Sequence, residues 1–67
     1  MNFDRDEIML MMLYDPGTRL GLAQELRLMQ CYLMPDETAL RELSDSVICK
    51  LERMTDAEFA RIEFPVN

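Results

Sequence analysis

The first apolar segment of the chain is a run of seven consecutive apolar residues at 8–14, Ile-Met-Leu-Met-Met-Leu-Tyr. Just before it, Asp4 and Glu7 have the spacing of a capping box. This pattern predicts a helix from about Asp4 to Tyr14. Because the run is apolar on every side, a small bundle can cover only part of the helix. The remaining side is the best candidate for a binding surface.

A second apolar segment follows a break at 15–17, where Asp-Pro-Gly ends the first helix. Thr18 is placed to cap the next helix. Apolar residues then recur at spacings of four, three and four, at Leu22, Leu26, Met29 and Leu33. This period predicts an amphipathic helix of about fifteen residues.

The clearest amphipathic pattern follows a second break at 34–36, Met-Pro-Asp. It predicts a third helix whose apolar side carries five residues at helical spacing: Leu40, Leu43, Val47, Leu51 and Met54. Thr55 and Glu58 then repeat the spacing of a capping box. We therefore predict a short fourth helix that ends near Glu63, before Pro65.

The breaks between the predicted helices are short, which favours antiparallel packing of neighbouring helices. We therefore expect an all-α fold, a small antiparallel bundle of three main helices plus a short C-terminal helix. Residues 1–67 should form a single helical domain. A chain of this length buries roughly 60% of the surface that its unfolded form exposes, which leaves little room for a cleft.

The charge balance narrows the choice of partners. Thirteen acidic residues against seven basic ones give a net charge of −6, which disfavours direct binding to a phosphate backbone. No stretch approaches the roughly 20 apolar residues of a membrane span, and residues 2–7 lack the basic segment of a signal peptide. We expect a cytoplasmic protein that binds neither nucleic acid directly nor a membrane.

The sequence offers little catalytic chemistry. It contains no histidine, so Ser44 and Ser46 have no imidazole base. Cys31 and Cys49 form no CxxC pair and point to neither a zinc site nor a redox site. We expect no catalytic residue, no cofactor and no metal, and two reduced thiols on or beside the core.

Two features are candidates for contact with a partner. Methionine packs well in cores, but part of the first helix, Met9 or Met12 with Leu13, can stay exposed and accept a helix of another protein or of a second copy of the chain. Arg19 is the other candidate, because nothing in its local sequence requires an arginine there. The predicted partner-binding residues are therefore Met9, Met12, Leu13 and Arg19, and a homodimer is one possible outcome.

Eleven blocks of residues, spread over nearly the whole chain, carry a family resemblance: Met1-Asn2-Phe3, Tyr14, Gly17-Thr18-Arg19, Gly21-Leu22, Leu26, Met29, Tyr32-Leu33, Asp36-Glu37, Leu40, Lys50-Leu51 and Met54-Thr55-Asp56-Ala57-Glu58-Phe59. In these blocks the chain resembles the putative transposon-transfer assisting protein family. The resemblance implies a small bacterial protein, encoded on a conjugative transposon of a Gram-positive host, with a supporting role in transfer of the element. It implies no catalytic residues.

Three hypotheses follow. The leading one is a non-enzymatic accessory protein that binds a protein of the transfer machinery through an apolar helical face. The second is an acidic mimic of nucleic acid, or a regulator, that occupies a DNA-binding protein. The third is a helix-turn-helix protein that uses the predicted second and third helices, with Arg19, Arg27 and Arg41 as a local basic patch.

Overall fold

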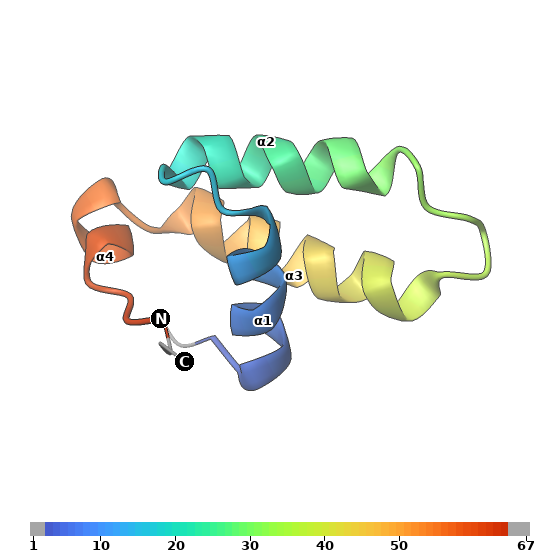
Figure 1. Ribbon diagram of the computed structural model, residues 1–67, viewed down its shortest axis with the longest axis horizontal. Helices are drawn as coiled ribbons and strands as arrows, with labels where there is room; N and C mark the ends of the chain where they lie inside the picture. Colours follow the sequence, from blue (N-terminus) through green and yellow to red (C-terminus); the bar gives the residue numbers. More distant parts are fainter. Residues whose placement is uncertain (1–2, 65–67) are drawn as a thin grey trace.

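The computed structural model describes residues 3–64, and these form four helices: α1 (Arg5–Tyr14), α2 (Arg19–Gln30), α3 (Thr38–Arg53) and α4 (Asp56–Ala60). The helices α2 and α3 lie side by side and antiparallel, α1 lies across them, and α4 follows the end of α3 (Figure 1). The described residues contain no strand, so the predicted all-α fold is confirmed. Met1, Asn2 and Pro65, to which the sequence analysis refers, lie outside the described residues.

Three helices begin at the caps that the sequence predicts. Asp4 accepts a hydrogen bond from the backbone N–H of Glu7 at 2.8 Å, and the Glu7 carboxylate accepts one from the Asp4 N–H at 3.0 Å. The same capping box is formed by Thr55 and Glu58 before α4. Thr18 caps α2. These bonds satisfy N–H groups that have no partner within their own helix.

The helix α2 ends at Gln30, so the prediction that it continues through Leu33 is wrong. The backbone N–H groups of residues 31–33 bond to carbonyls three positions back, which tightens the chain into a turn. Leu33 lies in this turn and is still half-buried. The apolar spacing therefore extends beyond the last helical residue, which is why it predicted too long a helix.

The helix α4 ends at Ala60, before the predicted end near Glu63. The N–H groups of Arg61 and Ile62 also bond three residues back. Beyond this turn, Ile62 and Phe64 pack against the core. Ending the helix early lets the chain return its last described apolar side chains to the core.

The core lies where α1 crosses the α2–α3 pair, and it consists of nine buried residues: Leu10, Met11, Leu22, Ala23, Leu26, Val47, Ile48, Leu51 and Met54. Cys31 and Cys49 are both free and exposed, so the prediction that they lie on or beside the core is wrong. On α3, Ile48 and Leu51 take the inward positions, and the helical rotation of about 100° per residue turns Cys49 outward.

A buried carboxylate fixes α1 on α3. Glu7 is only 2% exposed, and its Oε1 atom lies 2.6 Å from the Nζ of Lys50. Its Oε2 atom accepts a hydrogen bond from the hydroxyl of Ser46 at 2.9 Å. The Lys50 Nζ also lies 5.3 Å from the centroid of the Phe3 ring. The sequence predicted only the helix-terminal role of Glu7, because Ser46 and Lys50 are 39 and 43 residues away.

These contacts also determine the charge state of Glu7. Burial raises the pKa of this carboxyl group. Hydrogen bonds from the Asp4 N–H, Lys50 and Ser46, together with the charge of Lys50, lower the pKa by a larger amount. The net effect is a pKa below the ordinary value of 4.5. Glu7 is therefore ionised at neutral pH, and the folded state stabilises that charge.

We expect Glu7→Gln to lower the free energy of unfolding by about 1–3 kcal/mol, because the neutral amide removes the ion pair between residue 7 and Lys50. Urea unfolding followed by circular dichroism measures the change. Asp6→Asn is the matched control, since Asp6 lies in the same helical turn but is exposed. Equal loss in the two variants would contradict a special role for Glu7.

The stability contribution of Glu7 should also depend on pH. Because the folded-state pKa is lowered, the contribution is present above about 4.5 and is lost as the pH falls through the folded-state value. The difference in unfolding free energy between the native chain and Glu7→Gln should therefore shrink between pH 7 and about pH 3. A difference that stays constant over this range would show that the carboxylate charge is not the cause.

Candidate functional site

The exposed side of α1 carries three large apolar side chains. Met9 is 54% exposed, Met12 42% and Leu13 79%. Their spacing of three and four residues places them together, while Leu10 and Met11 of the same helix are buried. The structure thus brings together three of the four predicted partner-binding residues. Their binding to a partner stays a prediction.

A groove runs from the end of α1 to the second half of α2. It has a volume of about 430 Å³ and is lined by Tyr14, Glu25, Leu28, Met29 and Tyr32. Leu28 and Tyr32 are 57% and 85% exposed. Neither residue is among those predicted to bind a partner, although both lie off the apolar stripe of the second helix. Their position off the stripe was the only feature of the sequence that indicated their exposure.

A second groove lies between the start of α1 and the first half of α3. Its volume is about 590 Å³, and it combines an apolar lining with acidic residues: Ala39, Leu40 and Leu43 with Asp4, Asp6, Glu7 and Glu42, and with Ser46. We call the first hollow the tyrosine groove and the second the acidic groove.

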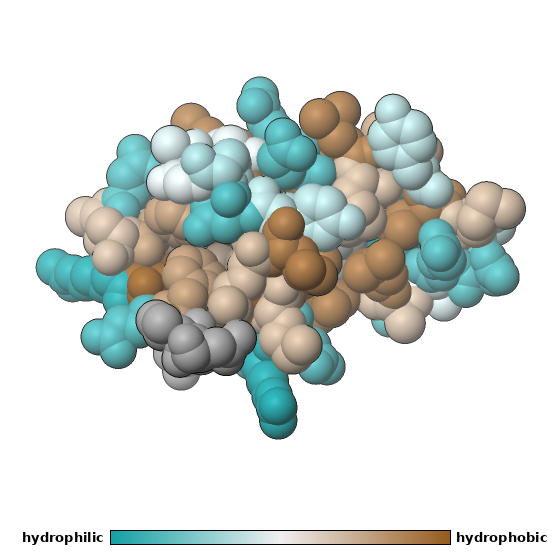
Figure 2. Space-filling model, viewed as in Figure 1, coloured by the Kyte–Doolittle hydropathy of each residue, from teal (hydrophilic) through white to brown (hydrophobic). Residues whose placement is uncertain are grey.

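Figure 2 shows apolar side chains over α1 and again toward the end of the α2–α3 pair where the two helices are connected.

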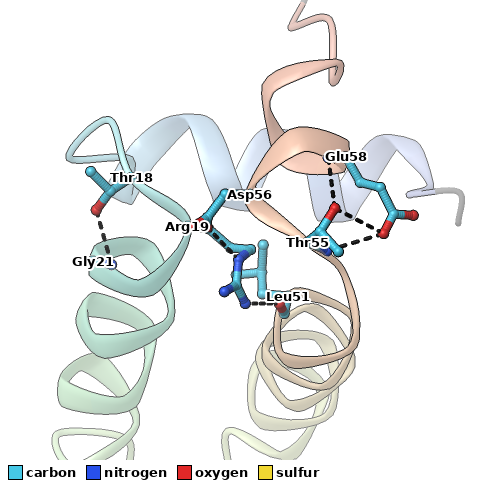
Figure 3. A network of polar contacts seen from close by, with 7 residues as sticks. All are labelled: Thr18, Arg19, Gly21, Leu51, Thr55, Asp56 and Glu58. Atoms are coloured by element: carbon cyan, nitrogen blue, oxygen red, sulfur yellow. Dashed lines mark hydrogen bonds and ion pairs between the residues drawn. The ribbon is translucent and has the colours of Figure 1, made fainter.

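Arg19 connects the ends of three helices (Figure 3). Its Nε atom lies 2.8 Å from Oδ1 of Asp56, and its Nη1 atom donates to the carbonyl oxygen of Leu51 at 2.7 Å. This carbonyl is one of the last four of α3, which have no partner within the helix. The cation also suits the C-terminus of α3, while Asp56 suits the N-terminus of α4.

The local sequence gave no reason for an arginine at position 19, and these contacts supply one. The Arg19 side chain is only 15% exposed, and its partners are 32 and 37 residues away along the chain. Arg19 is therefore a structural residue of the bundle. Its contact with a binding partner stays a prediction.

The turn before Arg19 depends on two glycines. Gly17 has a φ of +101°, a conformation that side chains with a Cβ atom rarely adopt. At Gly21, a Cβ atom would lie 2.5 Å from the Oγ1 of Thr18 and 2.9 Å from the Cγ of Pro16. The conformation and the close approach explain why both positions carry glycine.

The helix-turn-helix hypothesis finds no support in the arrangement of α2 and α3. The two helices are antiparallel and are joined by residues 31–37, whereas that motif crosses two helices at about 90–120° through a short turn. Arg19 is paired with Asp56, and the Nη2 of Arg27 lies 2.7 Å from Oε2 of Glu52. Two of the three arginines of the supposed basic patch are thus neutralised within the fold.

The hydroxyl groups of Ser44 and Ser46 serve the fold. Ser44 is buried, accepts a hydrogen bond from the amide of Gln30 at 2.7 Å and donates one to the Arg41 carbonyl at 3.0 Å. Ser46 donates to Glu7. Residues 3–64 contain no group of histidine, cysteine or acidic residues arranged to hold a metal ion. Within the same residues, no helix has the length and apolar character needed to cross a membrane.

Comparison with known proteins identifies a family. A family model described as "Putative transposon-transfer assisting protein" matches residues 3–65, nearly the whole chain. No curated protein and no solved structure matches the chain significantly. The matched residues include the turn around Gly17, Arg19 with its partners Leu51 and Asp56, and the exposed side of α1.

We expect Arg19→Ala to lower the free energy of unfolding by about 1–2 kcal/mol, because the Leu51 carbonyl loses a charged donor. The exposed ion pair with Asp56 adds little, so Asp56→Asn should cost less than Arg19→Ala. Urea unfolding of the two variants tests this order. Arg61→Ala, at an exposed arginine, is the control. An Arg19→Ala variant as stable as this control would contradict the structural role.

Proposed function

Because the chain belongs to the transposon-transfer assisting protein family, we propose that it assists transfer of a conjugative transposon by binding a protein of the transfer machinery. The family match supports the role in transfer. Binding to a protein partner is supported by the surface of α1. The binding residues in this proposal are Met9, Met12 and Leu13.

The observation that carries the proposal is the cluster of three exposed apolar side chains on one side of α1. Exposed apolar side chains that occur singly are common, but adjacent ones on a small protein mark an interaction surface. Methionine adapts to differently shaped partners because its side chain is flexible and polarisable. A helix of the partner that packs on this side of α1 would remove these side chains from water.

The proposed role is non-enzymatic. The chain has no histidine, and the hydroxyl groups of Ser44 and Ser46 make hydrogen bonds within the fold. We propose that the protein acts in the cytoplasm. Its contribution would be to bring a partner into position or to hold it in one state.

The acidic-mimic hypothesis is the second candidate, and the net charge of −6 is the observation in its favour. A mimic would present unpaired acidic groups to a basic surface, and three of the thirteen acidic residues, Glu7, Glu52 and Asp56, are instead paired with cations of the chain. A complex of this kind would weaken steeply with salt, whereas an apolar interface would not. A second copy of the chain is another possible occupant of the α1 surface.

The proposal predicts that Met12→Asp abolishes capture of the partner. The tagged native chain and its variants are used to retain proteins from cells that carry the element, with nuclease treatment, followed by mass spectrometry. Met34→Asp is the matched control, because Met34 is 61% exposed but lies outside α1. We expect at least tenfold less partner with Met12→Asp and unchanged capture with Met34→Asp.

Two further measurements complete this test. Circular dichroism must show that Met12→Asp stays folded, which we expect because Met12 is 42% exposed. Capture is then repeated at low and high salt. A partner retained equally by both variants, and lost at high salt, would favour the acidic mimic and overturn the proposal. Retention that requires intact nucleic acid would overturn it as well.

A further inference from the structure

The apolar stripes of α2 and α3 are incompletely covered at one end. Their members far from the α2–α3 connection are buried, while the members near it are only half-buried: Met29 and Leu33 on one side, and Leu40 and Leu43 on the other. The cause is the direction of α1, which crosses the pair away from the connection instead of running along it (Figure 1). A helix in this orientation covers only the part of the two stripes that it crosses.

Both grooves lie over this uncovered end. The tyrosine groove uses residues of the second half of α2, and the acidic groove uses residues of the first half of α3. Both have mostly apolar exposed linings. Both grooves border α1, the acidic groove at its start and the tyrosine groove at its end.

The charged side chains that line the two grooves all have the same sign. The acidic groove has Asp4, Asp6, Glu7 and Glu42, the tyrosine groove has Glu25, and no lysine or arginine lines either one. Glu7 is paired with Lys50. Within residues 3–64, Asp6, Glu25 and Glu42 take part in no ion pair. An apolar surface bordered by unpaired carboxylates favours a binding segment that carries both apolar and basic side chains.

We propose that a basic amphipathic helix of the partner protein docks over the two grooves, beside α1. Its apolar side would cover Leu28, Leu40 and Leu43, and its lysines or arginines would face Glu25 and Glu42. This proposal rests on the proposed function and adds the chemical class of the segment that binds. It also places that segment beside α1, whose Asp6 and Tyr14 line the two grooves.

Charge argues against the other occupants of this surface. A second copy of the chain also carries a net charge of −6, so its acidic grooves would repel those of the first copy. A nucleic acid would bring phosphates against Asp6, Glu25 and Glu42. A basic helix is the occupant that gains from both the apolar floor and the acidic edges.

The experiment uses synthetic peptides as the probe, because the partner is unidentified. The first is a fluorescent helical peptide of about 15 residues with leucines at helical spacing and lysines elsewhere. The second replaces each lysine with glutamate, and the third shuffles the first so that no apolar side forms. Fluorescence anisotropy with the full chain measures the affinity. We expect the first peptide to bind at least tenfold more tightly than the other two.

Matched variants locate the binding site. Glu42→Lys reverses a charge in the acidic groove, and Glu52→Lys reverses one on the same helix outside both grooves. We expect about fivefold weaker binding for Glu42→Lys and less than a twofold change for Glu52→Lys. Leu28→Ser in the tyrosine groove should weaken binding, while Leu20→Ser, at an equally exposed leucine of α2, should not.

Each outcome decides the proposal. Equal binding of the shuffled peptide, or equal effects of Glu42→Lys and Glu52→Lys, would show diffuse charge attraction and overturn it. A dimer of the native chain in sedimentation analysis that Leu28→Ser dissociates would assign the grooves to a second copy and also overturn it. If the peptides fail but Met12-dependent capture of a cellular partner persists, the proposed function stands and only this inference is lost. If that capture fails, the proposed function falls whatever the peptides do.

Discussion

The position of α1 depends on the buried carboxylate of Glu7. Removing a carboxylate from water is costly, and the cost is offset here by Lys50, by Ser46 and by the backbone of Asp4. All of these groups must meet the two oxygens of one side chain, so the rotation of α1 about its axis is restricted. Because Glu7 points inward, Met9, Met12 and Leu13 must point outward. One polar contact thus determines which apolar side chains remain available to a partner.

Arg19 fixes the helices at the end of the α2–α3 pair that lies away from their connection. It joins the start of α2 to the end of α3 and the start of α4, where unpaired backbone groups of two helices meet. The glycine turn before it lets the chain reach this position after α1. Glu7 thus fixes α1 on α3, and Arg19 fixes the start of α2 and the start of α4 at the end of α3.

The direction of α1 is also the structural origin of the candidate site. Because α1 crosses the α2–α3 pair, it covers the stripes of the two helices over only part of their length. Leu40 and Leu43 therefore stay half-buried beside unpaired carboxylates. A protein with this surface can be stable alone and still gain from binding one more helix.

The sequence by itself determined the local features of this protein. Caps at Asp4, Thr18 and Thr55 and the apolar period of three and four residues were enough to predict four helices, because these signals act between residues a few positions apart. The apolar run at 8–14 also indicated that part of α1 would stay exposed. Only the tertiary structure decided which part, because the partners of Glu7 and Arg19 lie more than thirty residues away. The two grooves could not be predicted from the sequence either, because each is lined by residues of α1 and of a second helix that only the tertiary structure brings together.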